Sequence, residues 1–279
     1  LNGDPTTPGR PLPAAFLRRY TGYNDIPVFD YGSNSSYHSL QVTANRRFSK
    51  QFQFTSAWTW SKAMDYVDAN TGTVSVQINP KVWNYGLAGF DRTHVVKLSW
   101  IWDVPQLGKR LGNKFAGAVL DRWQVSGIAT FRSGAPTGIG LGFVNATDTT
   151  GSPTDGARVV VVANPVIPKS DRTFSRNFNT EAFAAPAVGT FGNAAKTLIR
   201  GPGVNNWDIS LFKDIPLGTE RLKAQLRGEF YNAFNHTQFT GLDTNTRFDA
   251  QGRQVNARLG EYTVAAAARR IQFALRLTF

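Results

Sequence analysis

Apolar and polar residues alternate along the last segment of the chain, RRIQFALRLTF, as far as the final residue, Phe279. From Ile271 onward every second residue is apolar, which predicts a strand with one apolar and one polar face. Segments of about ten residues with this period of two recur between clusters of Gly, Pro, Asn and Asp. Seven are predicted to be strands, over residues 37–48, 51–62, 94–104, 122–134, 206–214, 221–234 and 271–279. Helical periodicity is nearly absent, so we predict an all-β fold, an antiparallel meander of about seven strands.

The connections between these strands are short at one end of the meander and long at the other. A tight turn joins the first two strands, and the segment IPLGTE joins the fifth and sixth. Only the link between the third and fourth strands is of middling length. Long polar loops over 65–93, 133–205 and 235–266 make the other links. This arrangement is typical of outer-membrane barrels, whereas soluble sandwiches usually have loops of similar length at both ends.

We therefore predict one partial β-barrel domain over residues 1–279, in which 1–35 are extracellular chain and 36–279 hold the seven transmembrane strands. Bacterial single-chain barrels have even strand numbers, so seven strands predict that the start of the barrel is absent from the sequence. No run of about 20 apolar residues is present, which excludes a transmembrane helix. The opening residues, LNGDPTTPGRPLP, lack the basic and apolar regions of a signal peptide.

The placement of charge favours a barrel in lipid over a soluble sheet. Arg or Lys at the bilayer midplane costs about 2–4 kcal/mol, and about 0–1 kcal/mol near the interfaces. On the predicted lipid faces charge occurs only at strand ends, at Arg46, Lys62 and Lys213. The opposite faces would line a lumen and attract an anionic substrate. The candidate ligand contacts there are Lys97, Arg132, Lys223, Arg227 and Arg276.

A competing interpretation, which we favour, assigns these five cations a structural role. Asp103, Asp208 and Glu229 also fall on the predicted lumen faces. Opposite charges on neighbouring strands stabilise a sheet, so the cations would pair with these three carboxylates.

Aromatic residues fall where an outer-membrane barrel carries its interfacial belts. The tryptophans lie near strand ends, where an indole N–H stays within reach of water. With the short turns taken as periplasmic, Phe52, Trp102, Trp123 and Phe279 lie near the periplasmic rim, and Trp60, Phe131, Trp207 and Phe230 near the outer rim. An amphipathic last strand that ends on Phe279 suits the periplasmic rim.

Composition excludes several other classes of protein. The formal net charge of +12 raises nucleic acid as a partner, but no run of five or more basic residues occurs, so we predict no nucleic-acid binding. Cysteine is absent, which excludes disulfides and thiolate metal sites. No motif of a hydrolase, metalloprotease or nucleotide-binding enzyme is present. We therefore expect neither enzymatic activity nor a cofactor.

Three local features have a functional and a structural interpretation, and the structural one is favoured in each. His94 follows Asp91 and is expected to be a loop-to-strand junction residue, not part of a catalytic dyad or metal site. The segment DYVDAN, over 65–70, is expected to be a solvated acidic turn, not a Ca²⁺ site. The segment GIGLGF, over 138–143, is expected to be a mobile loop, not a phosphate cradle.

Six blocks of the sequence resemble the C-terminal barrel portion of Oar-like TonB-dependent receptors, occur in the same order and cover most of the chain. The blocks are NSSYHSLQVTANRRFS, FTSAWTWSKAMD, FDRTHVVKLSWIWDVP, FAAPAVGTFGNAAKTLIRGPGVNNWDISLFKD, LRGEFYNAFNHTQF and RRIQFALRLTF. The resemblance implies the last third of a barrel of about 22 strands. It also implies uptake of a bulky substrate with energy passed from the TonB complex. The family's carboxypeptidase-regulatory-like domain, plug and TonB box are not recognisable in the sequence.

Two other function classes compete with an outer-membrane receptor segment. A soluble or surface-displayed β-sheet module, such as a carbohydrate-binding or adhesin domain, would use its aromatics as sugar platforms. Aromatics at both ends of the strands argue against it, since a sugar platform sits in one place. A basic nucleic-acid-binding domain lacks the compact basic patch that it needs.

Overall fold

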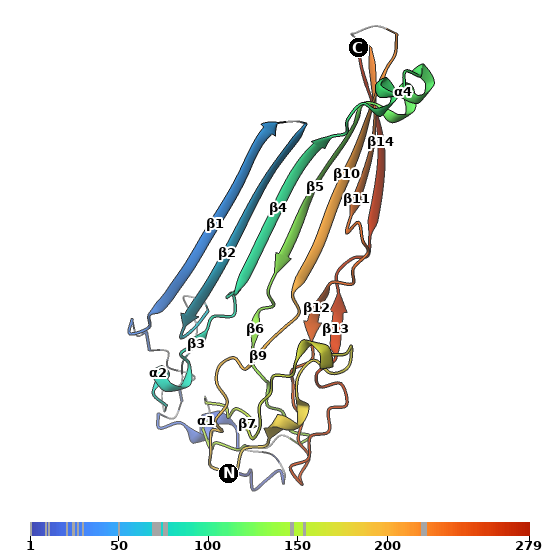
Figure 1. Ribbon diagram of the computed structural model, residues 1–279. Helices are drawn as coiled ribbons and strands as arrows, with labels where there is room; N and C mark the ends of the chain where they lie inside the picture. Colours follow the sequence, from blue (N-terminus) through green and yellow to red (C-terminus); the bar gives the residue numbers. More distant parts are fainter. Residues whose placement is uncertain are drawn as a thin grey trace.

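The computed structural model of the chain describes residues 2–8, 10, 12–20, 22–23, 26, 28–29, 31–49, 51–68, 74, 78–145, 148–152, 155–218 and 222–279. Its main feature is one antiparallel sheet of seven long strands in the order β1-β2-β4-β5-β10-β11-β14 (Figure 1). These strands are β1 (Ser35–Ser49), β2 (Phe52–Asp65), β4 (His94–Asp103), β5 (Trp123–Arg132), β10 (Val204–Pro216), β11 (Lys223–Tyr231) and β14 (Arg270–Thr278). The predicted all-β antiparallel meander is confirmed.

The other elements are short. The short strands are β3 (Gly86–Leu87), which pairs with β2, β6 (Pro136–Thr137), β7 (Val160–Val161), β8 (Phe183–Ala184), β9 (Ile199–Arg200), β12 (Phe239–Leu242) and β13 (Tyr262–Ala265). The helical turns are α1 (Ala14–Leu17), α2 (Pro80–Trp83), α3 (Leu107–Arg110), α4 (Lys114–Leu120), η1 (Lys169–Asp171) and η2 (Thr180–Ala182). No helix among the described residues is long and apolar enough to cross a membrane.

The strand register places the alternating apolar residues of all seven strands on one face of the sheet. Directly paired residues point to the same face, so a single row of pairs joins Trp58, Val96 and Phe131 across three strands. We call this the apolar face. It carries Leu40, Val42, Ala44, Phe52, Phe54, Trp58, Trp60, Val96, Leu98, Trp100, Trp102, Trp123, Val125, Ala129, Phe131, Trp207, Ile209, Leu211, Leu226, Phe230, Ile271, Phe273, Leu275 and Leu277.

The opposite side, the polar face, carries the residues between them. One of its rows joins Ser210 on β10 to Glu229 on β11 and then to Gln272 on β14. The apolar face is left uncovered by the described residues, and Phe273 on β14 is 72% exposed. A sheet with such an exposed apolar face is suited to lipid, because lipid solvates these side chains.

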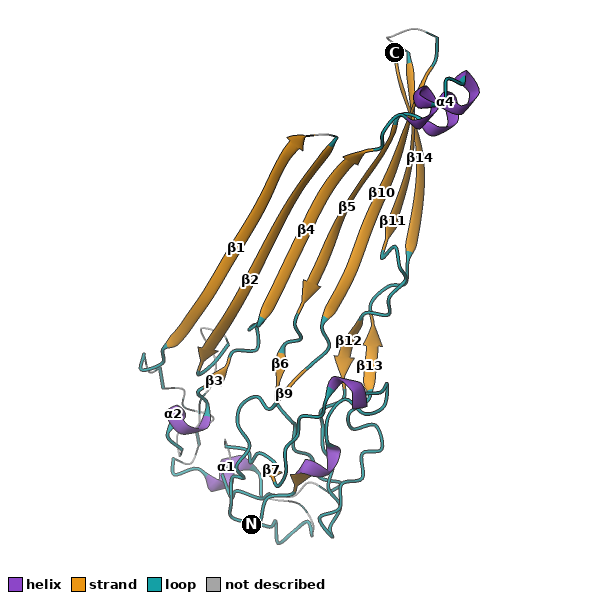
Figure 2. Cartoon of the chain, viewed as in Figure 1, coloured by secondary structure: helices purple, strands orange, loops and turns teal. Residues whose placement is uncertain are grey.

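The connections lie at two distinct ends of the sheet (Figure 2). At the turn end lie the short links, the helices α3 and α4 between β4 and β5, and the C-terminus. At the loop end lie the N-terminal segment and the three long connections, which follow β2, β5 and β11. The N-terminal segment contacts this region through Asn2, whose amide donates hydrogen bonds to the Asp148 carboxylate (3.2 Å) and the Gly151 carbonyl (3.1 Å).

The link between β4 and β5 is a compact helical hairpin. The Asp121 carboxylate accepts hydrogen bonds from the backbone N–H groups of Gly108 (2.7 Å) and Lys109 (3.1 Å). α3 and α4 approach so closely that a Cβ on Gly108 would lie 2.3 Å from the Gly117 Cα. Lys213, on the apolar face, is buried here: its ammonium donates to the Asp121 carbonyl and lies 5.3 Å from the Trp123 ring centroid. These contacts hold a cation at the turn end of a lipid-facing surface.

The hydrophobic core of the molecule lies outside the sheet, among the long connections. Residues of the β5–β10 and β11–β14 connections pack together there into a unit that we call the loop body. Its buried core consists of Ile139, Val159, Phe178, Ala182, Phe183, Ala194, Ile199, Phe248 and Leu259. The segment 138–143 is part of this unit, because Gly140 and Phe143 form β-bridges with Asn245 and Phe248. The expected mobile loop is therefore wrong: the segment is packed.

The sheet is open within the described part of the chain. β1 pairs with β2 alone and β14 with β11 alone, so each leaves one edge without a strand partner. In lipid, unpaired backbone groups cost several kcal/mol each, so these two edges need partners that the described residues do not supply.

Candidate ligand-binding site

The five cations predicted to contact ligand all lie on the polar face, but the structure does not bring them together. Arg132 ends β5 at the loop end, and Lys97 lies nearby on β4, opposite Thr130 of β5. The other three lie on the last two strands: Lys223 opposite Thr278, Arg227 opposite Ala274, and Arg276 opposite Gln225. The five positive charges are therefore distributed along the polar face and do not form one cluster.

The favoured pairing of these cations with carboxylates on neighbouring strands is wrong. None of the five forms an ion pair with a described residue, because the residues directly opposite them are uncharged. The carboxylates have neutral donors instead. Asp103 accepts from the Gln124 amide (2.7 Å), Asp208 from the backbone N–H of Asn232 (2.9 Å) and Glu229 from the Tyr231 hydroxyl (3.0 Å).

The predicted interfacial aromatics lie on the apolar face, toward both ends of the strands. At the turn end, Phe52 lies opposite Trp102 of β4, and Trp123 begins β5. At the loop end, Trp60 lies opposite His94 of β4. Two more of these aromatics lie on later strands. Trp207 of β10 lies opposite Ala129. Phe230 of β11 lies opposite Ile209 and Ile271. Phe279 follows β14 at the turn end and is 97% exposed.

Trp207 is the centre of an aromatic cluster on this face. Its ring centroid lies 5.9 Å from that of Trp100, 5.5 Å from that of Phe131 and 5.6 Å from that of Phe234, all in edge-to-face arrangements. Its indole N–H donates to the Asn205 side chain (3.0 Å), so this polar atom has a partner in the protein. Beside the cluster, an apolar groove of about 480 Å³ is lined by Phe52, Phe54, Leu98, Trp100, Trp102 and Trp207. By register, the groove is part of the apolar face, which is the side suited to lipid.

Two ion-pair sites fasten the loop body to the loop end of β2. The fully buried Asp91 carboxylate accepts a hydrogen bond from the Ala63 N–H (2.7 Å) and pairs with the Arg200 guanidinium (2.7 Å). Lys196 pairs with both Asp65 (2.5 Å) and Asp68 (2.9 Å). Both cations come from the end of the β5–β10 connection.

These pairs contradict one expectation, and the position of His94 agrees with another. Asp65 is buried and its carboxylate pairs with the Lys196 ammonium, so the expectation of a solvated acidic turn is wrong for this residue. Asn70, which belongs to the same predicted turn, lies outside the described residues. Partial burial acts to raise the pKa of Asp68, but the Gly89 N–H and Lys196 outweigh it and lower the pKa. His94 is a junction residue, as expected, and it does not contact Asp91: its Nδ1 accepts a hydrogen bond from the Trp58 indole (3.3 Å).

A third contact between the loop body and a neighbouring loop is made by Arg158, which binds backbone carbonyls and an aromatic ring. The Arg158 guanidinium donates to the backbone carbonyls of Trp83 (2.5 Å) and Ala194 (3.3 Å), and lies 4.1 Å from the Trp83 ring centroid. Burial lowers the pKa of Arg158. Arg158 thereby ties α2 to the loop body.

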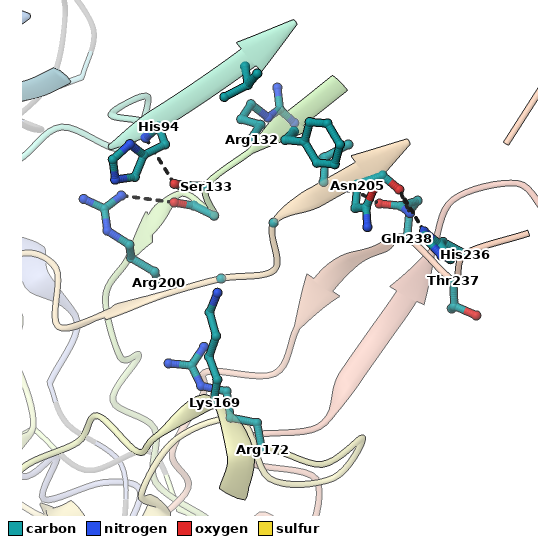
Figure 3. A pocket seen from close by; sticks show the side chains of 16 residues that line it. His94, Arg132, Ser133, Lys169, Arg172, Arg200, Asn205, His236, Thr237 and Gln238 are labelled. Carbon is teal, nitrogen blue, oxygen red and sulfur yellow. Dashed lines mark hydrogen bonds between the residues drawn. The ribbon is translucent and has the colours of Figure 1, made fainter. Parts of the chain in front are cut away.

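A pocket of about 760 Å³ lies between the loop ends of β4, β5 and β10 and the loop body (Figure 3). We call it the rim pocket. No Asp or Glu is among the described residues that line it. Its charged and titratable lining residues are His94, Arg132, Lys169, Arg172, Arg200 and His236. The rim pocket is therefore strongly electropositive, and only Arg132 among the five predicted ligand contacts belongs to it.

The donors of the rim pocket come from opposite sides. Figure 3 shows Lys169 extending from the loop body toward the strand ends, where His94 and Arg132 lie, with Arg172 beside its base. The Trp58 indole N–H can only donate, so His94 Nδ1 is the acceptor of their hydrogen bond. The ring proton of His94 therefore lies on Nε2, which can donate to a ligand. Arg172 donates from Nε and one terminal nitrogen to the Ile167 carbonyl (3.4 and 3.3 Å). Its other terminal nitrogen has no hydrogen-bond partner among the described residues.

Two glycines allow the backbone segments beneath the rim pocket to approach closely. A Cβ on Gly134 would lie 1.8 Å from the Gly201 carbonyl oxygen, and one on Gly203 would lie 2.8 Å from the Arg132 carbonyl oxygen. Real Cβ atoms do not occupy such positions, so only glycine fits. The residues that follow β5 therefore pack closely against those that precede β10, beneath the rim pocket.

The sequence-based reasoning missed most of this site. The long loops supply Lys169, Arg172, Arg200 and His236, whereas the candidate ligand contacts predicted from the sequence all lie on strands. They are separated by many residues in the sequence and have no shared motif. The only sequence signal was the net charge of +12, which does not indicate position.

Comparison with known proteins gives the family. The model of the outer membrane beta barrel domain matches residues 2–272, nearly the whole chain. No curated protein and no solved structure matches the chain. The family match agrees with the uncovered apolar face, the polar opposite face and the aromatics at both strand ends. The chain thus belongs to the outer membrane beta barrel domain family and is a protein of the outer membrane.

Proposed function

We propose that the chain is the barrel part of an outer-membrane TonB-dependent receptor of the Oar-like type, which takes up a bulky substrate with energy from the inner membrane. The observation that carries this proposal is the loop body, a folded unit with its own hydrophobic core at the loop end of the sheet. A barrel that only spans the membrane does not need such a unit. A receptor does, because its loops must present a fixed binding surface.

The polar face supports the same proposal. Its five cations have no carboxylate partner among the described residues, so their charge is available to a substrate. Three ion pairs and the Arg158 contacts hold the loop body and its neighbouring loops beside this face. Substrate captured at the loop end would next meet the polar face.

We propose no catalytic role and no cofactor. The soluble alternative does not hold, because membership of the family places the chain in the outer membrane. The partners of this function are outer-membrane lipid, a TonB complex that acts through a plug domain, and a bulky substrate, with no role for nucleic acid.

The test is a comparison of culture media. The parent organism, a strain without the gene for the full-length protein and a strain without TonB are grown in the same complex medium. We expect at least one large solute that the parent depletes and that both mutant strains leave behind. A gene deletion without any such solute, or solutes that the TonB-deficient strain still depletes, would contradict energy-coupled uptake.

A further inference from the structure

We propose that the rim pocket binds a phosphate group. Three of its cations, Arg132, Lys169 and Arg172, have no ion pair among the described residues. The fourth, Arg200, already neutralises Asp91, a buried residue behind the pocket. The pocket therefore has an excess of about three positive charges.

This excess favours phosphate over a carboxylate. One carboxylate would leave two of the three cations unneutralised, whereas a phosphate monoester carries about −1.5 to −2 charges near neutral pH. Arginine also presents several N–H donors in a fork that matches the oxygens of phosphate. Neutral donors on the strand side are the His94 Nε2–H and the Ser133 hydroxyl, whose oxygen accepts a hydrogen bond from the backbone N–H of His94 (3.1 Å).

The size of the rim pocket shows that the phosphate would be one part of a larger ligand. Its volume of about 760 Å³ falls among pockets of about 300–1,000 Å³ that hold organic ligands. Val96 and Phe131 supply an apolar wall, and by register both lie on the apolar face. Arg132, by contrast, belongs to the polar face. The pocket thus reaches both the side that meets lipid and the side that meets substrate.

Two sources can supply this phosphate, and one titration distinguishes them. The first is the phosphorylated headgroup of a lipid in the outer leaflet, and the second is a soluble phosphorylated ligand. The full-length protein is purified in a phosphate-free detergent and titrated with inorganic phosphate by calorimetry. We expect saturable binding.

Two double variants test whether phosphate binds in the rim pocket or is attracted by the positive charge of the protein in general. Lys169→Gln with Arg172→Gln removes two cations from the rim pocket. Lys109→Gln with Arg110→Gln removes two exposed cations from α3 at the opposite end of the sheet and is the matched control. We expect the pocket variant to bind phosphate at least about tenfold more weakly, since it loses charge-assisted hydrogen bonds. The control should bind like the wild type. Heat-modifiable gel migration verifies that both variants are folded.

The source of the phosphate is read from the same titration in phosphatidylcholine nanodiscs that contain either lipid A or dephosphorylated lipid A. If only lipid A blocks inorganic phosphate, the pocket holds a lipid headgroup. If phosphate binds equally in both nanodiscs, the ligand is soluble. Absence of saturable phosphate binding in detergent, or equal weakening in the control, would overturn the proposal.

A soluble phosphorylated ligand would be the transported substrate, and that interpretation rests on the proposed function. Binding itself does not, because the titration uses purified protein without TonB or an energy source. A failed titration with TonB-dependent uptake intact would reject only the phosphate site, and the reverse result would reject only the transport function.

Discussion

The indole of Trp100 on β4 lies over Gly127, the residue directly opposite it on β5. A Cβ on Gly127 would lie 2.4 Å from Cζ2 of this indole and 2.7 Å from the backbone oxygen of Asp208 on β10. The glycine thus makes room for a ring that packs against Trp207 at a centroid distance of 5.9 Å. One residue without a side chain allows the aromatic cluster of the apolar face to form.

We expect Gly127→Ala to lower the free energy of unfolding by about 1–3 kcal/mol, the usual cost of overpacking. The added methyl group meets the Trp100 ring and also backbone, which has little room to shift. Urea unfolding in detergent, followed by tryptophan fluorescence, measures the change. Gly156→Ala is the control, because a Cβ there meets nothing within 4 Å. Equal stability of the two variants would show that Trp100 does not occupy this position.

Asp91→Asn is expected to loosen the loop body. The amide keeps the shape of the side chain and can still accept from the Ala63 N–H, but it loses the charge that pairs with Arg200. Charge-assisted hydrogen bonds of this kind contribute about 1.5–3 kcal/mol. Hydrogen exchange of the full-length protein should therefore accelerate over residues 199–201. Asp249→Asn, which breaks a pair with the exposed Arg253, should leave exchange there unchanged; the reverse pattern would contradict the assigned role of Asp91.

The contact of Asp68 with Lys196 is expected to be lost in acid. The pKa of Asp68 is lowered in the folded protein, so its stabilising contribution is present above the unfolded pKa and disappears as the pH falls through the folded pKa. With an ordinary Asp pKa of about 3.9, the loss occurs below about pH 4. Pepsin cleavage within residues 66–90 should therefore increase steeply between about pH 4 and about pH 2. In Asp68→Asn, the increase in cleavage between about pH 4 and about pH 2 should be smaller than in the wild type. An increase as large as that of the wild type would show that other carboxylates cause the acid sensitivity of this segment.

Lys97→Gln is expected to change the free energy of unfolding by no more than about 0.5 kcal/mol, as is usual for residues without a specific partner. Lys97 lies opposite Ala57 and Thr130, and no ion pair is broken. Arg200→Gln provides the contrast, because it leaves the buried Asp91 carboxylate without its cation. A clear loss of stability in Lys97→Gln would restore the cross-strand pairing that the structure contradicts.

Much of the sheet could be predicted from alternation alone. Side chains alternate between the two faces of a strand, so the pattern from Ile271 to Phe279 fixes which residues share a face without reference to any neighbour. The same local rule assigns Trp102 and Phe131 to one face and Lys97 and Arg132 to the other. The register of the sheet agrees with all four assignments.

The rim pocket could not be predicted in this way. Lys169 and Arg200 belong to a long connection without periodicity, and their positions depend on the core that Phe178 and Phe248 form between two connections distant in sequence. The pairing of Arg200 with Asp91 depends on the same packing.

The sequence by itself determined the strands, their two faces and the membrane as their surroundings, because these depend on the order of neighbouring residues and the cost of placing charge in lipid. The tertiary structure alone decided which charges meet. Cations on adjacent strands lie within reach of a carboxylate only in one particular register, and here Arg276 lies opposite Gln225, not an acid. Loop cations converge only after their backbone has packed around a shared core. Local pattern therefore fixes the barrel surface, and long-range packing fixes the site.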